Sequence, residues 1–134
     1  MKFSVHGDFE LRVVDNIMIL DGSGYGNCEA VEKYKREAMP IKQQLAATGK
    51  PWGNVLHLQN QAMMVQEAIA KVNASAKITH TMGLTHVGIV LDNMSYEALV
   101  KDCWTRVYRD TGITIQFFYD EQSALQWVRD NIKP

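Results

Sequence analysis

The stretch Asp21-Gly22-Ser23-Gly24-Tyr25-Gly26 is the segment of this chain that most resembles an anion-binding loop. It follows the apolar run 17–20 and precedes a helical pattern that starts at Asn27. Backbone N–H groups at such a turn, together with the positive end of the helix, can bind a phosphate. However, the stretch matches neither G-x-G-x-x-G nor G-x-x-x-x-G-K-[ST], and the next basic residue is Lys33. A turn in which glycines supply positive φ angles is therefore the better interpretation.

Histidine and cysteine are the other residues whose types could do chemistry. His57 and His86 lie in strands predicted to be neighbours and could meet, but the chain has no H-x-x-x-H pair of the kind that zinc enzymes use. Cys28 lies at a predicted helix start, where a thiolate is stabilised, whereas Cys103 takes a core-facing helix position. No G-x-S-x-G motif is present. We therefore predict no metal ligand and no catalytic residue.

Composition excludes several classes of function. The 134 residues are 46% hydrophobic and 22% charged, with a formal net charge of −1, which is typical of one globular domain over residues 1–134. Scattered basic residues argue against duplex nucleic acid as a partner. No window offers the roughly twenty apolar residues that span a bilayer, and Asp8 and Glu10 interrupt any leader-like start. We expect a cytoplasmic protein with reduced cysteines.

The elements that position these residues begin with a hairpin and a long helix. Apolar and polar residues alternate over residues 3–14, and a second apolar run covers 17–21, so an antiparallel hairpin with a turn at Asp15-Asn16 is predicted, with a further turn at Gly7-Asp8 as an alternative. From Asn27 the apolar period becomes helical and continues to Gly49. Pro40 lies inside this pattern, so we expect the helix to bend or break near Glu37.

Three strand and helix pairs follow. Because strands that alternate with helices need crossover connections, the strands are expected to be parallel. The pattern predicts an α/β domain with a mixed, mostly parallel sheet of about five strands, an N-terminal antiparallel hairpin and four helices. The predicted elements are a strand at 55–58, a helix at 62–73, a strand at 84–93, a helix capped by Ser95, a strand at 113–118 and a helix capped by Asp120.

This order of elements resembles the STAS domain superfamily, in particular its divergent SpoIIAA-like bacterial relatives. The resemblance lies in "ILDG" at the end of the hairpin, in "TGKPWGNVLHL", and in the ending "ITIQFFYDEQSALQWVRDNI". It covers nearly the whole chain. It implies a domain without catalytic activity that serves in regulation, protein contact or ligand binding.

The resemblance also implies a place to look for a phosphorylation switch. In anti-sigma-factor antagonists a phosphorylated serine follows the third strand, and the corresponding segment here is 59–64, with the sequence QNQAMM. This segment contains no hydroxyl residue. A phosphoserine switch depends on adding about two negative charges at a helix start, so we do not expect this chain to be switched in that way.

We therefore expect a regulatory or interaction domain that binds a partner protein or a small apolar or anionic ligand, without a cofactor. The alternatives are a small flavin- or nucleotide-binding protein or enzyme that uses the loop Gly22–Gly26, and a homodimer formed through the methionines of the middle of the chain. Open α/β sheets bind ligands at the carboxyl ends of their strands. That rule selects the polar residues Ser23, Tyr25, Asn27, Asn60, Gln61, Asn93, Ser95 and Asp120.

Overall fold

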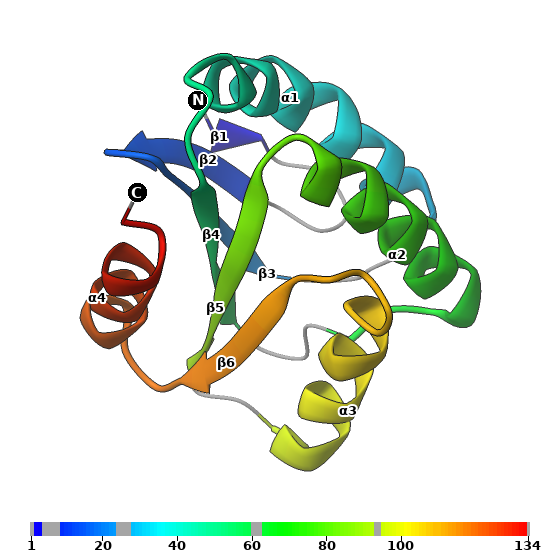
Figure 1. Ribbon diagram of the computed structural model, residues 1–134. Helices are drawn as coiled ribbons and strands as arrows, with labels where there is room; N and C mark the ends of the chain where they lie inside the picture. The colour runs from blue at the N-terminus through cyan, green and yellow to red at the C-terminus, as the bar shows by residue number, and fades with distance from the viewer. Residues whose placement is uncertain (1, 4–8, 24–27, 60–62, 93–94, 134) are drawn as a thin grey trace.

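Six strands form one mixed sheet in the order in which they follow one another along the chain (Figure 1). The computed structural model describes residues 2–3, 9–23, 28–59, 63–92 and 95–133. The first two pairings of the sheet are antiparallel and the next three are parallel, whereas the sequence pattern predicts about five strands with one antiparallel hairpin followed by parallel pairings. The strands are β1 (Lys2–Phe3), β2 (Phe9–Val14), β3 (Ile17–Ser23), β4 (Trp52–Gln59), β5 (Leu84–Asp92) and β6 (Thr114–Phe118).

Four helices cover the two faces of this sheet unequally. The crossover helices α1 (Cys28–Ala47), α2 (Gln66–Thr81) and α3 (Glu97–Val107) connect successive parallel neighbours. Because crossovers of one hand between neighbours in the same order place their helices on the same side, these three cover one face. Helix α4 (Glu121–Asn131) follows the last strand and lies on the opposite face (Figure 1). The predicted α/β class is confirmed.

Each face of the sheet has its own apolar core. On the α4 face, Ile17, Ile19, Val55 and Val90 pack against α4 and are fully buried. The alternate residues of the same strands, such as Met18 and Leu56, face the other side of the sheet and belong to the larger core under α1 to α3. Strands β3, β4 and β5 are thus covered on both sides, as their continuous apolar runs predict.

Two predicted boundaries were wrong. The helix expected at 62–73 is α2, which begins at Gln66 and continues to Thr81. Its second half is buried through Ala76 and Thr79, so tertiary packing overrides the weak helix propensity of this Asn-, Ser- and Thr-rich stretch. Ser95 does not cap α3, because Tyr96 occupies the N-cap position in left-handed conformation and no side chain caps this end.

The hairpin and the first helix agree with the sequence in outline. The expected strand over 3–14 is divided into β1 and β2, and Asp15 at the next turn has a positive φ of 55°. Helix α1 runs without a break through Pro40 and ends before Gly49, whose φ is 69°. Pro40 therefore does not end the helix.

No helix among the described residues is long and apolar enough to cross a bilayer. Both cysteines are free thiols: Cys28 is half-buried and Cys103 is buried.

Candidate functional site

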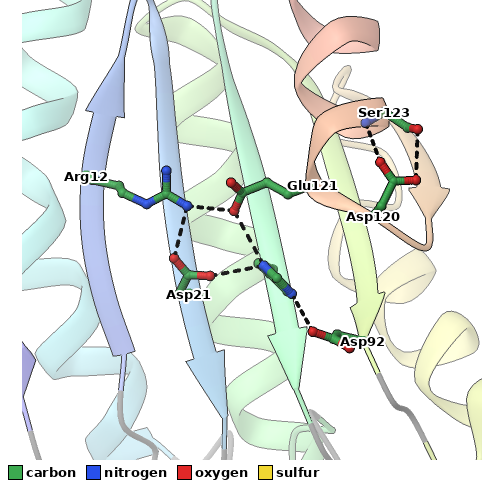
Figure 2. A network of polar contacts seen from close by, with 7 residues as sticks. Arg12, Asp21, Asp92, Asp120, Glu121 and Ser123 are labelled. Atoms are coloured by element: carbon green, nitrogen blue, oxygen red, sulfur yellow. Dashed lines mark hydrogen bonds and ion pairs between the residues drawn. The ribbon is translucent and has the colours of Figure 1, made fainter.

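A network of charged side chains lies on the α4 face, where the parallel strands reach their carboxyl ends (Figure 2). Along β3 the residues facing α4 are Ile17, Ile19 and then Asp21, and along β4 they are Val55 and then His57. The apolar rows thus end in titratable residues beyond the edge of the α4 core. The charged network consists of Arg12 on β2, Asp21 on β3, His57 on β4, Asp92 on β5 and Glu121 at the start of α4.

Arg12 connects two of the carboxylates. Its Nη2 atom donates to Oε1 of Glu121 at 2.7 Å and to Oδ2 of Asp21 at 3.3 Å. These contacts link the N-terminal hairpin to the first turn of the C-terminal helix. The two carboxylates are about three-quarters buried, so the guanidinium offsets charge that would otherwise be poorly hydrated.

His57 lies at the centre of the network and contacts three carboxylates. Its Nε2 atom lies 2.9 Å from Oδ2 of Asp92. Its Nδ1 atom lies 3.1 Å from Oδ1 of Asp21 and 3.4 Å from Oε1 of Glu121. Only 19% of the His57 side chain is exposed, so these contacts replace most of its water.

The network shifts the titration of its members. Burial lowers the pKa of His57, but the hydrogen bonds to Asp92 and Glu121 and the charges of Asp21 and Asp92 outweigh it, so the pKa lies above its usual value. For Glu121, burial raises the pKa, and contact with Arg12 and His57 brings it below its usual value. The hydrogen bond to Glu121 raises the pKa of Arg12. The network therefore favours charged side chains.

Two of the residues selected from the sequence are described completely, and one of them, Asp120, directly precedes Glu121 of this network. The Asp120 carboxylate caps α4, since Oδ1 accepts from Ser123 N at 2.7 Å and Oδ2 accepts from Ser123 Oγ at 2.9 Å (Figure 2). These hydrogen bonds lower the Asp120 pKa. Ser95 is exposed ahead of α3. Ser23 is the last residue of β3, and the other selected residues, Tyr25, Asn27, Asn60, Gln61 and Asn93, lie outside the described residues.

A second feature is a set of exposed apolar side chains at the start of α3 and just after the edge strand β6. We name it the α3–β6 surface, and define it by Tyr96, Leu99, Lys101, Phe117 and Tyr119. Tyr96, Leu99 and Tyr119 are 64%, 59% and 66% exposed. The Lys101 ammonium donates to the Tyr119 hydroxyl at 3.3 Å and lies over the rings of Phe117 and Tyr119. Helix α3 is thereby fixed to the end of β6.

The other candidate groups are separate from the network. The sheet register pairs His86 with Gly53 and His57 with Val90, so the two histidines do not meet. His86 packs edge-on against Trp127, and burial lowers its pKa. Cys28 Sγ lies 3.8 Å from a carboxylate oxygen of Glu67. The end of the loop Gly22–Gly26 lies outside the described residues, so its role as an anion site stays a prediction.

The sequence reasoning missed most of the charged network. It considered His57 only as a partner of His86, and it selected none of Arg12, Asp21, Asp92 and Glu121 as site residues, although Asp21 opens the glycine stretch. One signal could have found three of the members: in β3, β4 and β5, the alternating row of apolar residues ends in Asp21, His57 and Asp92 at the same edge of the sheet. Arg12 and Glu121 come from opposite ends of the chain, and only the topology brings them together.

Comparison with known proteins identifies the fold. No protein-family model matches the chain, and no curated protein sequence matches it. Among solved structures, it is similar to an uncharacterized protein of the DUF3478 family from Shewanella loihica PV-4, described as having a SpoIIAA-like fold. The sequences are 14% identical, the match covers 96% of this chain and 98% of the other, and the TM-score is 0.55. The chain therefore has a SpoIIAA-like α/β fold.

Proposed function

We propose that this chain is an interaction domain without catalytic activity that binds a partner protein through the α3–β6 surface. The observation that carries the proposal is the exposure of Tyr96 and Leu99 at the start of α3 and of Tyr119 just after β6. Tyrosine, which supplies two of these three side chains, is enriched at protein interfaces.

Two further features support binding at this place. Strand β6 is the last strand in the sheet order, so its outer main-chain groups have no strand partner among the described residues. An extended segment of a partner could pair with this edge and rest its side chains on Tyr119. The contact of Lys101 with Tyr119 also holds that ring in place, which reduces the entropy that binding would cost.

The backbone at Tyr96 adds to the argument. Its φ of 58° and ψ of 46° place a large side chain in the left-handed region, which is costly for a residue with a Cβ atom. Strained positions of this kind concentrate at binding sites. The Tyr96 side chain is also exposed, consistent with a role in contact.

The experiment is a comparison of partner capture by three immobilised proteins. Wild-type protein, the double variant Leu99→Ser/Tyr119→Ser and the control variant Ile78→Ser are exposed to lysate of the source cells, and retained proteins are identified by mass spectrometry. Ile78 is 61% exposed near the far end of α2. We expect a protein that wild type and I78S retain and the double variant loses. Equal retention by all three contradicts the proposal, and light scattering shows whether the partner is a second copy.

A further inference from the structure

The charged network contains three metal-ligand atoms that converge on one point. His57 Nδ1 lies 3.1 Å from Oδ1 of Asp21 and 3.4 Å from Oε1 of Glu121, and potential ligand atoms of all three residues lie within 4.8 Å of one another. With zinc bonds of about 2.0 to 2.1 Å, the ligand atoms of a tetrahedral site lie about 3.3 to 3.4 Å apart. The distance from Nδ1 to Glu121, 3.4 Å, matches this spacing, and the distance to Asp21, 3.1 Å, is slightly shorter.

We propose that Asp21, His57 and Glu121 bind a divalent transition-metal ion, with Asp92 as the outer carboxylate that orients the imidazole. One imidazole nitrogen and two carboxylate oxygens suit zinc and similar ions. Three protein ligands leave a coordination position for water or for a group of a partner. This site is independent of the partner contact proposed above, since it lies on the opposite face of the sheet.

The orientation of His57 is the second argument. Metal-binding histidines usually donate their other ring N–H to a carboxylate, which fixes the tautomer. Here Nε2 lies 2.9 Å from Asp92, so in the neutral form that binds a metal the Nε2–H group can donate to that carboxylate while Nδ1 faces Asp21 and Glu121. In the metal-free network the charged imidazole presents Nδ1–H to the two carboxylates, and a bound cation would take the place of that proton between the same three groups.

Charge balance is the third argument, and it includes Arg12. The carboxylates of Asp21, Asp92 and Glu121 and the guanidinium of Arg12 carry a net charge of two negative units, which one divalent ion neutralises. Arg12 contacts Oδ2 of Asp21, whereas His57 faces Oδ1. Arg12 can therefore hold the Asp21 carboxylate through Oδ2 and leave Oδ1 available to the metal. Glu121 contacts Arg12 and His57 through the same oxygen, Oε1, which has a second lone pair for a metal while it accepts from Arg12.

The ligands come from elements that hold their backbones in place. Asp21 and His57 are paired neighbours on β3 and β4, in the parallel part of the sheet. Glu121 is the first residue of α4, whose start is fixed by the Asp120 cap and whose Ala124 and Val128 are fully buried. Placement on strands and on a packed helix gives the rigidity that a metal site needs.

Zinc is the probe for the test. Full-length protein without an affinity tag is freed of metal by chelation and titrated with zinc chloride by calorimetry, alongside the variants H57Q, D21N and D92N and the control H86Q. We expect one ion per chain, a loss of affinity of at least tenfold in H57Q and D21N, a loss of about 10- to 100-fold in D92N, and a change below twofold in H86Q. A loss below tenfold in H57Q overturns the proposal.

A spectroscopic measurement on the wild-type protein keeps the test decisive if a variant fails to fold. Long-range ¹H–¹⁵N spectra report each imidazole nitrogen separately. One equivalent of zinc should shift the Nδ1 signal of His57 and leave the signals of His86 in place. Unchanged His57 signals, or binding that moves another histidine instead, overturn the proposal.

Discussion

Arg12 and Glu121 are 109 positions apart in the sequence, yet Nη2 of the arginine lies 2.7 Å from Oε1 of the glutamate. The contact joins the N-terminal hairpin to α4, the helix that covers the opposite face from α1 to α3. Glu121 is the first residue of α4, where a negative charge is also favoured by the helix dipole. The position of this helix relative to the hairpin therefore has an electrostatic component.

A double-mutant cycle with Arg12→Gln and Glu121→Gln should measure this component. Because the arginine side chain is 41% exposed, we expect a coupling free energy of about 0.5 to 1 kcal/mol by urea unfolding. About 1 M salt shortens the screening length to about 3 Å and should reduce the coupling. The more exposed pair Arg129 and Asp15, at 3.3 Å, is the matched control and should couple less. Zero coupling between Arg12 and Glu121 would contradict the contact.

His57 and His86 should titrate on opposite sides of the ordinary value of about 6.5. Burial lowers the pKa of both, but the carboxylates around His57 raise its pKa above the usual value. Stability from His57 is therefore present below about pH 6.5 and is lost as the pH rises through its folded-state pKa. For His86, stability is present above about pH 6.5 and is lost as the pH falls through its folded-state pKa.

NMR titration of the imidazoles in metal-free protein checks these directions. In unfolding experiments, H57Q should cost more stability at about pH 5 than at about pH 8.5, and H86Q the reverse. If both histidines titrate below the ordinary value, the carboxylates do not surround His57 as described.

Gly53 and Gly88 test how closely α4 packs on the sheet. A Cβ atom at Gly53 would lie 2.3 Å from Cγ1 of Val128 and 3.0 Å from the carbonyl oxygen of His86, so Gly53→Ala must displace α4. We expect a loss of about 2 to 3 kcal/mol of stability. At Gly88 the nearest atom would be Cβ of Ala124 at 3.2 Å, and Gly88→Ala should cost less than about 1 kcal/mol. Urea unfolding of both variants measures the two losses of stability. Equal losses for Gly53→Ala and Gly88→Ala would contradict this packing of α4 on the sheet.

The sequence predicts the order of elements well because each element carries its own periodicity. The alternation along β2 and the continuous apolar runs of β3 and β5 identify their places in the sheet, and Asp120 marks the start of α4. The boundaries that were wrong depend on tertiary contacts. The side chain of Asn73, for example, donates to the carbonyl oxygens of Val107 and Arg109, so it anchors the middle of α2 instead of ending it.

The candidate site is harder to predict for a related reason. The rule that ligands bind at carboxyl ends of strands selects the edge of the sheet at which the charged network lies, but not the face. His57 is two positions after Val55 on β4, so the two side chains lie on the same face of the sheet. That this face is the one covered by α4 follows only from the position of α4 in the structure. Glu121 follows the predicted cap residue directly, so its position was available from the sequence and its partners were not.

Substitutions at Tyr96 separate backbone strain from side-chain contact. Tyr96 is exposed and has a φ of 58°, so its side chain adds little packing while its Cβ atom disfavours the conformation. Tyr96→Gly should therefore be more stable than Tyr96→Ala by about 1 kcal/mol, although glycine is ordinarily the less stabilising residue. Thermal and urea unfolding of the two variants measure the difference. If the alanine variant is the more stable, the left-handed conformation is absent and the strain argument for this surface fails. If the glycine variant is more stable and also loses the captured partner, the Tyr96 side chain serves binding at a cost to folding.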